Sequence, residues 1–327
     1  MSIVILPHLG TSIPPYLADC VHQIRLWNKD TYIFVILDPV HEGVAFWNDL
    51  QSKYGVIYQY TDRLEPTIAH RMFVSAYKCD TAFRQGYWRY VVERFFYVEE
   101  LMRLLNLEHC LVLEYDVLIY TDLTALTQKF VTSAQTCRLV CDNKTRCYPS
   151  FIYAPTADEM GKINTFIQNN VASGLTDMEL LAKYGAETGG LHYLPVITEA
   201  RNRSVIPRTS LMGHSDANPY YLSEDSEHFG VLFDSLAVGQ YVGGVDPRNM
   251  GGRKSGRYIN ETALYTLDEM PFEWVRMGGL WKPIVDNRPL VMIHLHCKSL
   301  KSFLSDRVGM PTDDYTAEEI MGGLVRN

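Results

Sequence analysis

Short apolar runs alternate with helix-like segments over roughly the first third of the chain. Four of these runs are candidates for buried strands, at 2–6, 31–37, 56–60 and 110–120. Between them, apolar residues recur at helical spacing and predict helices over 14–27, 43–54 and 88–106. Because short connections join each strand to the next helix, the pattern predicts a mostly parallel, doubly wound α/β sheet flanked by helices.

The second half of the chain is less regular. Its hydrophobic pattern predicts one or two strands over 138–154, helices over 157–171, 176–184 and 234–243, and a late strand at 290–296. A loop-rich half for the substrate is expected here, because Gly, Asn, Ser and Pro are frequent between 201 and 260. No repeat, low-complexity tract or obvious linker interrupts the sequence, so residues 1–327 are predicted to form one continuous domain.

Composition narrows the class of protein. Hydrophobic residues make up 47% and charged residues 21% of the 327 residues, which is ordinary for a globular domain. The net charge of −8 argues against a nucleic-acid partner, which would need a basic stripe. No apolar run approaches the ~20 residues that a transmembrane helix needs, and the first residues lack the pattern of a signal peptide. A soluble protein is therefore expected.

Seven cysteines are scattered through the sequence. An odd, dispersed set in a chain of this length favours reduced thiols and a cytoplasmic setting. The group Cys137, Cys141 and Cys147 could suggest zinc, but no Cys-x-x-Cys pair accompanies it. A zinc site is therefore disfavoured.

Two carboxylates interrupt the apolar run at 110–120. Glu114 and Asp116 stand two residues apart, so in a strand both side chains would leave one face and Tyr115 the other. A simpler interpretation is a pair of solvated carboxylates near a strand end. The apolar flanks disfavour it, because buried carboxylates need a cationic partner. A divalent metal that carries a diphosphate is the natural candidate.

A second polar cluster lies near the end of the sequence, in the run His294-Leu295-His296-Cys297-Lys298. In a strand both histidines would share one face, with the lysine directly after them. A single histidine in a strand is more often a core residue, but two histidines followed by a lysine suggest a metal ligand and a phosphate-neutralising cation. Imidazole together with carboxylates suits Mn²⁺ or Mg²⁺.

Three further residues have open interpretations. Asp234 precedes a predicted helix, where an aspartate can cap the helix or serve as a base that deprotonates a hydroxyl. Arg89 and Arg94 lie on the helix that precedes the carboxylate pair, either as surface residues or as bidentate donors to a phosphate. The glycine-rich stretch 243–252 is interpreted as a mobile loop, and as a candidate lid.

Two common nucleotide-binding motifs are absent from the sequence. No Gly-x-Gly-x-x-Gly follows the first predicted strand, which disfavours a dinucleotide cofactor of the usual kind. No Gly-x-x-x-x-Gly-Lys-Ser/Thr is present either, which excludes a P-loop phosphotransferase.

The order of these motifs resembles a known family. A first strand that ends in His8-Leu9-Gly10, a helix with Glu93-Arg94-Phe95-Phe96, the Glu114-x-Asp116 pair and the late His-x-His-x-Lys run together resemble the GT-A glycosyltransferases. In this comparison Glu114-Tyr115-Asp116 corresponds to the Asp-x-Asp motif (DXD motif) in its Glu-x-Asp form. The late histidines correspond to the C-terminal histidine that completes the metal site of the family.

The resemblance implies a role for each candidate residue. Residues 1–125 would bind the nucleotide sugar, and 126–327 the acceptor. Base and ribose would be held by loops 7–11 and 38–42, that is by His8, Leu9, Gly10 and Asp38. The metal, Mn²⁺ or Mg²⁺, would be bound by Asp116 and His296, with His294 as the substitute ligand. The remaining candidates are Glu114 on the ribose or the metal, Lys298 and Arg94 on the diphosphate, and Asp234 at the position of a catalytic base.

The resemblance further implies a reaction and a setting. The chain would transfer a hexose or pentose from a nucleoside-diphosphate sugar, UDP- or GDP-linked, to a glycan or another hydroxyl acceptor, in a metal-dependent reaction of glycan biosynthesis. Similar anchor-free enzymes are cytoplasmic, of bacterial or viral type. Two alternatives stay open: a non-catalytic sugar-binding relative of the fold, and a sugar nucleotidyltransferase. The second is disfavoured because the first loop is not the glycine-rich, basic loop of those enzymes.

Overall fold

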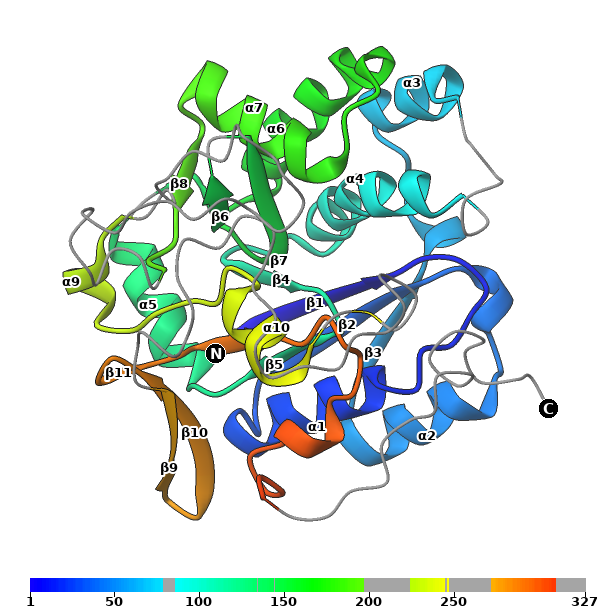
Figure 1. The fold of residues 1–327 in the computed structure, drawn as a ribbon. Helices are drawn as coiled ribbons and strands as arrows, with labels where there is room; N and C mark the ends of the chain where they lie inside the picture. The colour runs from blue at the N-terminus through cyan, green and yellow to red at the C-terminus, as the bar shows by residue number, and fades with distance from the viewer. Residues whose placement is uncertain are drawn as a thin grey trace.

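The computed structural model describes residues 1–78, 86–133, 135–143, 145–196, 224–244, 246 and 272–309. Cys79, most of the loop-rich segment 201–260 and most of the glycine-rich stretch 243–252 lie outside the described residues. In the described part, the strands form a seven-stranded sheet, a three-stranded sheet and a two-stranded sheet. The large sheet runs through the middle of the molecule, with helices on either side of it (Figure 1).

The large sheet is mostly parallel, as predicted. Its strand order is β3-β2-β1-β4-β7-β6-β8, and parallel pairing joins β3 to β2, β2 to β1, β1 to β4 and β6 to β8. Strand β7 pairs antiparallel with both of its neighbours. The strands are β1 (Ile3–His8), β2 (Tyr32–Leu37), β3 (Ile57–Tyr60), β4 (Cys110–Leu113), β6 (Cys137–Asn143), β7 (Arg146–Ala154) and β8 (Leu191–Tyr193).

Helices cover both faces of this sheet because its strands are apolar on both faces. Val4 and Leu6 of β1 pack into one hydrophobic cluster with helices α1 (Leu17–Trp27) and α2 (Ala45–Tyr54). Ile5, between them, packs into a second cluster on the opposite face. That cluster includes α4 (Tyr87–Leu105), α6 (Ala157–Asn169) and α7 (Asp177–Thr188). The doubly wound α/β class is therefore confirmed.

The predicted strand 110–120 is in fact two strands. Strand β4 ends at Leu113, and β5 (Val117–Ile119) leaves the large sheet to pair antiparallel with β12 (Met292–His294). Glu114, Tyr115 and Asp116 form the turn between them, so the alternation expected of a strand does not apply there. The sequence conceals this break because β4 and β5 are both fully buried and therefore equally apolar.

Several elements were not predicted from the sequence. Residues 272–289 form a small antiparallel sheet whose two longer strands extend away from the body as a hairpin (Figure 1). The unpredicted helices and strands are α3 (Ile68–Ala76), α5 (Leu123–Ser133), β8 (Leu191–Tyr193), α9 (Ser226–Phe229), β9 (Phe272–Met277), β10 (Leu280–Val285) and β11 (Arg288–Pro289). Short 3₁₀ turns are present at Pro39–His41, Thr61–Arg63, Val171–Ser173 and Lys301–Phe303.

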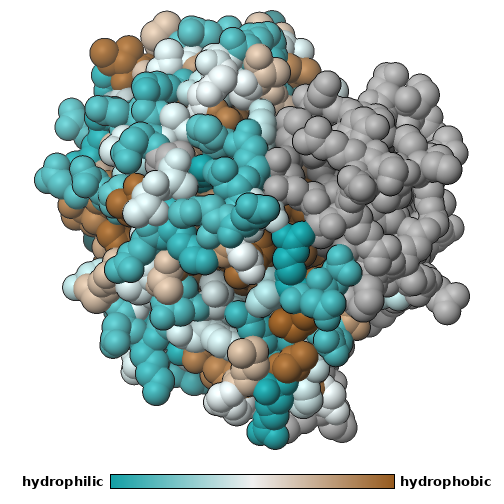
Figure 2. All heavy atoms as spheres, turned by 90° about the vertical axis from the view of Figure 1, so that its left-hand side faces the viewer, coloured by the Kyte–Doolittle hydropathy of each residue, from teal (hydrophilic) through white to brown (hydrophobic). Residues whose placement is uncertain are grey.

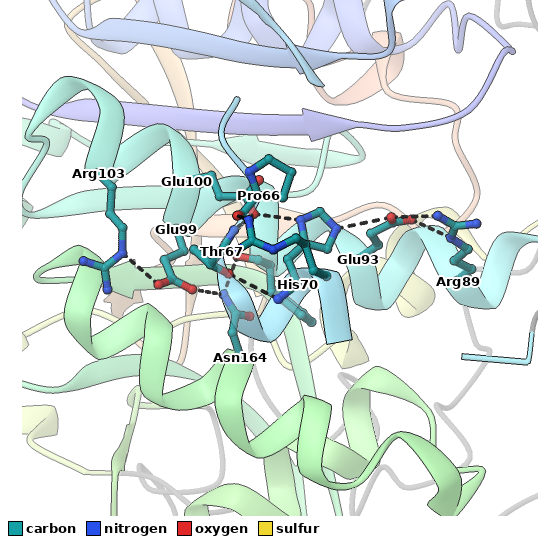
Figure 3. Close-up of polar contacts among 11 residues, drawn as sticks. Pro66, Thr67, His70, Arg89, Glu93, Glu99, Glu100, Arg103 and Asn164 are labelled. Atoms are coloured by element: carbon teal, nitrogen blue, oxygen red, sulfur yellow. Dashed lines mark hydrogen bonds and ion pairs between the residues drawn. The ribbon is translucent and has the colours of Figure 1, made fainter. Parts of the chain in front are cut away.

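A buried ionic cluster fastens α3 to α4. His70 of α3 lies between two glutamates of α4, with Nδ1 2.7 Å from Glu100 Oε1 and Nε2 3.3 Å from Glu93 Oε1 (Figure 3). Arg89, one turn earlier on α4, donates two hydrogen bonds to Glu93. The Thr67 amide, at the start of α3, donates to Glu100. These contacts explain how α3 is held although Ile68 on its outer side is 70% exposed.

The surface agrees with the globular composition. Figure 2 shows a face that is mainly hydrophilic, with hydrophobic residues in small separate patches. Within the described residues, no helix combines the length and the hydropathy that crossing a membrane requires.

Candidate active site

Three predicted metal ligands converge at the carboxyl end of β4. The ligand atoms of Glu114, Asp116 and His294 all lie within 4.8 Å of one another. His294 Nε2 is 3.2 Å from Asp116 Oδ2 and 3.4 Å from Glu114 Oε2. The carboxyl ends of parallel strands β1, β2 and β4 meet at this edge of the sheet, which is where ligands bind in doubly wound folds.

The small sheet of β5 and β12 brings these residues together across about half of the chain. His294 pairs with Val117 in the ladder, directly after Asp116. The Leu295 amide then donates to the Asp116 carbonyl at 2.8 Å, which extends the alignment past the end of both strands. The turn at Glu114–Asp116 is in turn fixed to the large sheet, because the Glu114 amide donates to the Ser150 carbonyl of β7 at 3.1 Å.

His294, not His296, is the histidine that joins the carboxylates. Strand β12 ends at His294 and the backbone turns, so the two histidines do not share a strand face as predicted. His296 instead accepts a hydrogen bond from the Asp246 amide at 3.3 Å, and its ring centroid is 6.3 Å from that of His294. Burial, with the nearby Lys298, lowers the pKa of His296 to about 3. The geometry thus places His294, which the sequence suggested only as the substitute ligand, beside the carboxylates, and a metal-binding role for either histidine stays a prediction.

Lys298 lies on the same carboxylate as His294. Its ammonium donates to Asp116 Oδ2, and its backbone adopts a left-handed conformation with φ 63° that returns the side chain toward the site. Burial alone would raise the pKa of Asp116, but the charges of Lys298 and His294 hold it well below its ordinary value. Asp116 is therefore an ionised carboxylate at neutral pH.

Arg94 of α4 bridges two carboxylates. Its Nη1 donates to Glu114 Oε1 at 2.6 Å, and its Nη2 donates to Asp177 Oδ2 at 2.9 Å. Asp177 was not among the predicted site residues. It occupies the first turn of α7, directly after Thr176, which forms a capping box with Glu179. The capping box could have located the start of α7 from the sequence. No residue near Asp177 in the sequence, however, indicates that Arg94 contacts it.

Asp177 has a raised pKa. Burial raises the pKa of Asp177 to about 6, although Arg94 opposes the shift.

Arg89, the other arginine predicted as a phosphate donor, lies elsewhere. Arg89 forms an ion pair with Glu93 at 2.8 Å, so its guanidinium belongs to the cluster that fastens α3. Of the two arginines considered, Arg94 is the one at the carboxylates.

The donor set fits a divalent cation that prefers oxygen. Two carboxylates and one imidazole are ligands that Mn²⁺ and Mg²⁺ accept, whereas a structural zinc site would be built from thiolates and histidines. Arg94 and Lys298 face the same carboxylates as a pair of fixed cations. The group therefore offers carboxylate and imidazole ligands to a metal, with two cations beside them.

Loops 7–11 and 38–42, which were predicted to hold the base and ribose of the sugar nucleotide, meet at the same edge of the sheet. Strands β1 and β2 end in register, with His8 opposite Leu37. The Gly10 amide donates to Asp38 Oδ2 at 2.7 Å, and the Thr61 hydroxyl donates to Asp38 Oδ1 at 2.9 Å. Asp38 thus joins the loops that follow three neighbouring strands. Its contact with a nucleotide, like those of Leu9 and Gly10, remains a prediction.

His8 is an interior residue of the first loop. His8 is 1% exposed, and its ring lies among His41, Trp47 and Tyr115, with centroid distances of 5.2, 5.6 and 5.3 Å. Its Nε2–H donates to the Ser12 carbonyl at 2.7 Å. Burial, followed by the neighbouring His41, lowers the pKa of His8 to about 3. The imidazole is therefore neutral, and its visible role is to shape the loop.

Asp234 has the contacts of a structural residue. It is fully buried; Oδ1 accepts from the Val238 amide at 2.9 Å, and Oδ2 accepts from the Gly239 and His294 amides at 2.9 and 3.1 Å. Helix α10 (Ala237–Gly243) begins three residues later than predicted. Both oxygens therefore serve the helix start and the His294 backbone, and this geometry gives a catalytic-base role no support.

Helix α10 lies unusually close to the histidine segment. A Cβ added to Gly239 would be 1.8 Å from the His294 carbonyl oxygen, and one added to Gly243 would be 2.7 Å from Cys297 Sγ. The Gly-x-x-x-Gly spacing, which puts Gly239 and Gly243 on one helix face, is the sequence signal for this approach. Together with Asp234, these glycines fix the backbone from which His294 points at the carboxylates.

No family model matches the chain, and neither does any curated protein. Several solved structures are similar to it. Mouse xyloside xylosyltransferase 1 is 9% identical over 59% of this chain and 85% of its own, with a TM-score of 0.45. The galactosyltransferase LgtC is 11% identical over 59% and 73%, with a TM-score of 0.41. A cytidylyltransferase from Leptospira borgpetersenii is 10% identical over 59% and 75%, with a TM-score of 0.35. Likenesses this distant assign no function.

Proposed function

We propose that the chain is a metal-dependent glycosyltransferase of the GT-A type, which transfers a sugar from a UDP- or GDP-linked donor to a glycan or another hydroxyl acceptor. One observation carries the proposal. Glu114, Asp116 and His294 converge beside Lys298 and Arg94 at the edge where the parallel strands end. Carboxylates that hold a divalent ion, with arginine and lysine beside them, form a combination that suits a metal-bound diphosphate.

In this proposal Asp116 and His294 hold Mn²⁺ or Mg²⁺, with Glu114 as the third ligand or as the partner of the ribose. The ion would supply positive charge to the leaving nucleoside diphosphate. Lys298 contacts Asp116, and Arg94 contacts Glu114. In this proposal both cations would therefore lie within reach of the phosphate oxygens bound to the ion. Leu9, Gly10 and Asp38 would form the wall for base and ribose, and the buried His8 would hold the shape of that loop.

The acceptor belongs to the second half of the chain, residues 126–327, in the same proposal. Besides His294 and Lys298, Asp177 of that half lies at the site, where it accepts a hydrogen bond from Arg94. Burial raises the pKa of Asp177 to about 6, so in this proposal it would be a carboxyl of variable protonation near the bound sugar. A cytoplasmic setting of bacterial or viral type remains part of the proposal.

Two other functions use the same fold. A sugar nucleotidyltransferase would bind the phosphates with a glycine-rich, basic first loop, whereas residues 7–11 read Pro-His-Leu-Gly-Thr. A non-catalytic sugar-binding protein would need no group of metal ligands beside fixed cations, so the convergence of Glu114, Asp116 and His294 next to Lys298 and Arg94 disfavours it.

Turnover of a panel of UDP- and GDP-sugars with Mn²⁺ tests the proposal. Release of the nucleoside diphosphate should fall by about 100-fold or more in Asp116→Asn, since even the outer partners of metal ligands are worth 10–100-fold. His22→Gln, which removes a partly exposed pair with Asp306, is the matched control. Equal turnover in Asp116→Asn and wild type would refute the assignment, and so would glycan binding without any turnover.

A further inference from the structure

Two of the cysteines lie against each other in the sheet. Cys141 of β6 and Cys147 of β7 are direct partners in the antiparallel ladder, and both are fully buried. Their sulfur atoms are 3.0 Å apart. Cys137, which completes the group considered for zinc, lies at the start of β6 and contacts Met160 Sδ at 3.8 Å. The three cysteines therefore form a pair and a separate thiol.

The spacing of the pair suits a covalent bond. Directly opposed residues on antiparallel strands have Cβ atoms about 4.5–5.5 Å apart, and a disulfide needs about 3.5–4.5 Å between them. The two sulfurs need to approach by only about 1 Å to reach the bond length of about 2.05 Å. The ladder shifts register on both sides of Cys141, after Leu139 and before Asn143, so the strand has the irregularity that permits such an adjustment.

We propose that Cys141 and Cys147 are a redox-active dithiol that closes to a disulfide when the protein meets a peroxide. One thiol loses its proton, and its thiolate attacks hydrogen peroxide: an S–O bond forms, the O–O bond breaks, and the leaving hydroxide takes up that proton as water, which leaves a sulfenic acid. The second thiol attacks the sulfenic sulfur, the S–S bond forms, and a second water leaves. The two thiols together lose two electrons, and one hydrogen peroxide takes them up and is reduced to two waters.

A disulfide between Cys141 and Cys147 would stabilise the β6–β7 hairpin. The bond would join β6 to β7 next to the turn of their hairpin and restrict that hairpin. Strand β7 also supports the active site, because its Ser150 carbonyl accepts from the Glu114 amide at 3.1 Å. The oxidised protein is therefore expected to have a β6–β7 hairpin that resists unfolding more than the reduced one. Burial restricts the reaction to small oxidants.

Peptide mapping of the full chain tests the proposal. The protein is treated with hydrogen peroxide, unfolded in the presence of an alkylating agent without reductant, and digested with trypsin. Cleavage after Arg138, Lys144 and Arg146 separates the two cysteines into peptides 139–144 and 147–162. The expected product is these two peptides joined, at about 2 Da less than their sum, and separated again by dithiothreitol.

Two variants sharpen the result. Cys147→Ser should abolish the joined peptide, whereas Cys137→Ser, the matched control at the start of β6, should leave it unchanged. The wild-type digest stands by itself if either variant folds poorly. The proposal is overturned if peroxide leaves both cysteines open to alkylation, converts them to sulfinic acids without the joined peptide, or links either one to a different cysteine.

Discussion

Replacing His70 with glutamine should remove a pH-dependent part of the stability of the fold. Both ring nitrogens of His70 face carboxylates, Glu100 at 2.7 Å and Glu93 at 3.3 Å, in the interface between α3 and α4 (Figure 3). Burial opposes a charge on His70, but its hydrogen bonds with Glu100 and Glu93 outweigh burial and raise its pKa from 6.5 to about 9. The histidine is therefore a buried imidazolium, and glutamine keeps a polar contact without the charge.

The magnitude follows from the two pKa values. A rise from 6.5 to about 9 corresponds to about 3 kcal/mol, because each pKa unit is worth about 1.4 kcal/mol. Since the pKa is raised in the folded state, this contribution is fully present below about pH 6.5 and is lost as the pH rises to about 9. Loss of one partner from a buried ion pair typically costs about 3–5 kcal/mol, which agrees in scale.

Urea unfolding followed by tryptophan fluorescence, at a series of pH values from about 6 to about 9.5, measures this effect. The free energy of unfolding of the wild type should fall by about 3 kcal/mol more across that range than that of His70→Gln. His22→Gln is the matched control, because His22 pairs with Asp306 at 3.0 Å in a partly exposed position where ion pairs contribute little. Parallel loss of stability in wild type and His70→Gln would refute a charged His70.

Two further substitutions test the packing and the charges around the site. Gly239→Ala should destabilise the protein by about 1–3 kcal/mol or more, because its Cβ would meet the His294 carbonyl at 1.8 Å, and an unchanged melting temperature would contradict that close approach. Arg94→Gln should lower the free energy of unfolding by about 3–5 kcal/mol, because Glu114 and Asp177 lose the cation between them. Urea titration measures the second effect, and a shift below about 1 kcal/mol would show that the bridge contributes as little as a surface pair.

The sequence predicted the layered α/β core because its signals are local. Strands β1 and β2 are short apolar runs with helix-like segments between them, and their burial on both faces follows from that composition. Helix α3 was not predicted because its hydrophobic pattern is misleading. Its buried side includes the polar His70, while Ile68 and Met72 are 70% and 49% exposed, so its hydrophobic pattern does not mark the buried face.

The site was predicted in part. Glu114, Asp116 and the late histidine cluster could be named from their residue types, but the choice of His294 over His296 depends on where β12 ends and how the chain turns there. Asp177 could not be connected with Arg94, since 83 residues separate them and the contact exists only after α7 packs beside β7 and α4. The capping function of Asp234 depends on α10 beginning at Ala237.

Calorimetric titration with UDP and with GDP, with and without Mn²⁺, tests the central claim most directly. At least one nucleotide should bind, and Mn²⁺ should tighten that binding by about 10-fold or more. His294→Ala should lose the effect of Mn²⁺, while His296→Ala, its matched control two residues later, should keep it. Binding of neither nucleotide, or binding that is the same with and without Mn²⁺, would contradict a diphosphate–metal site at Glu114, Asp116 and His294.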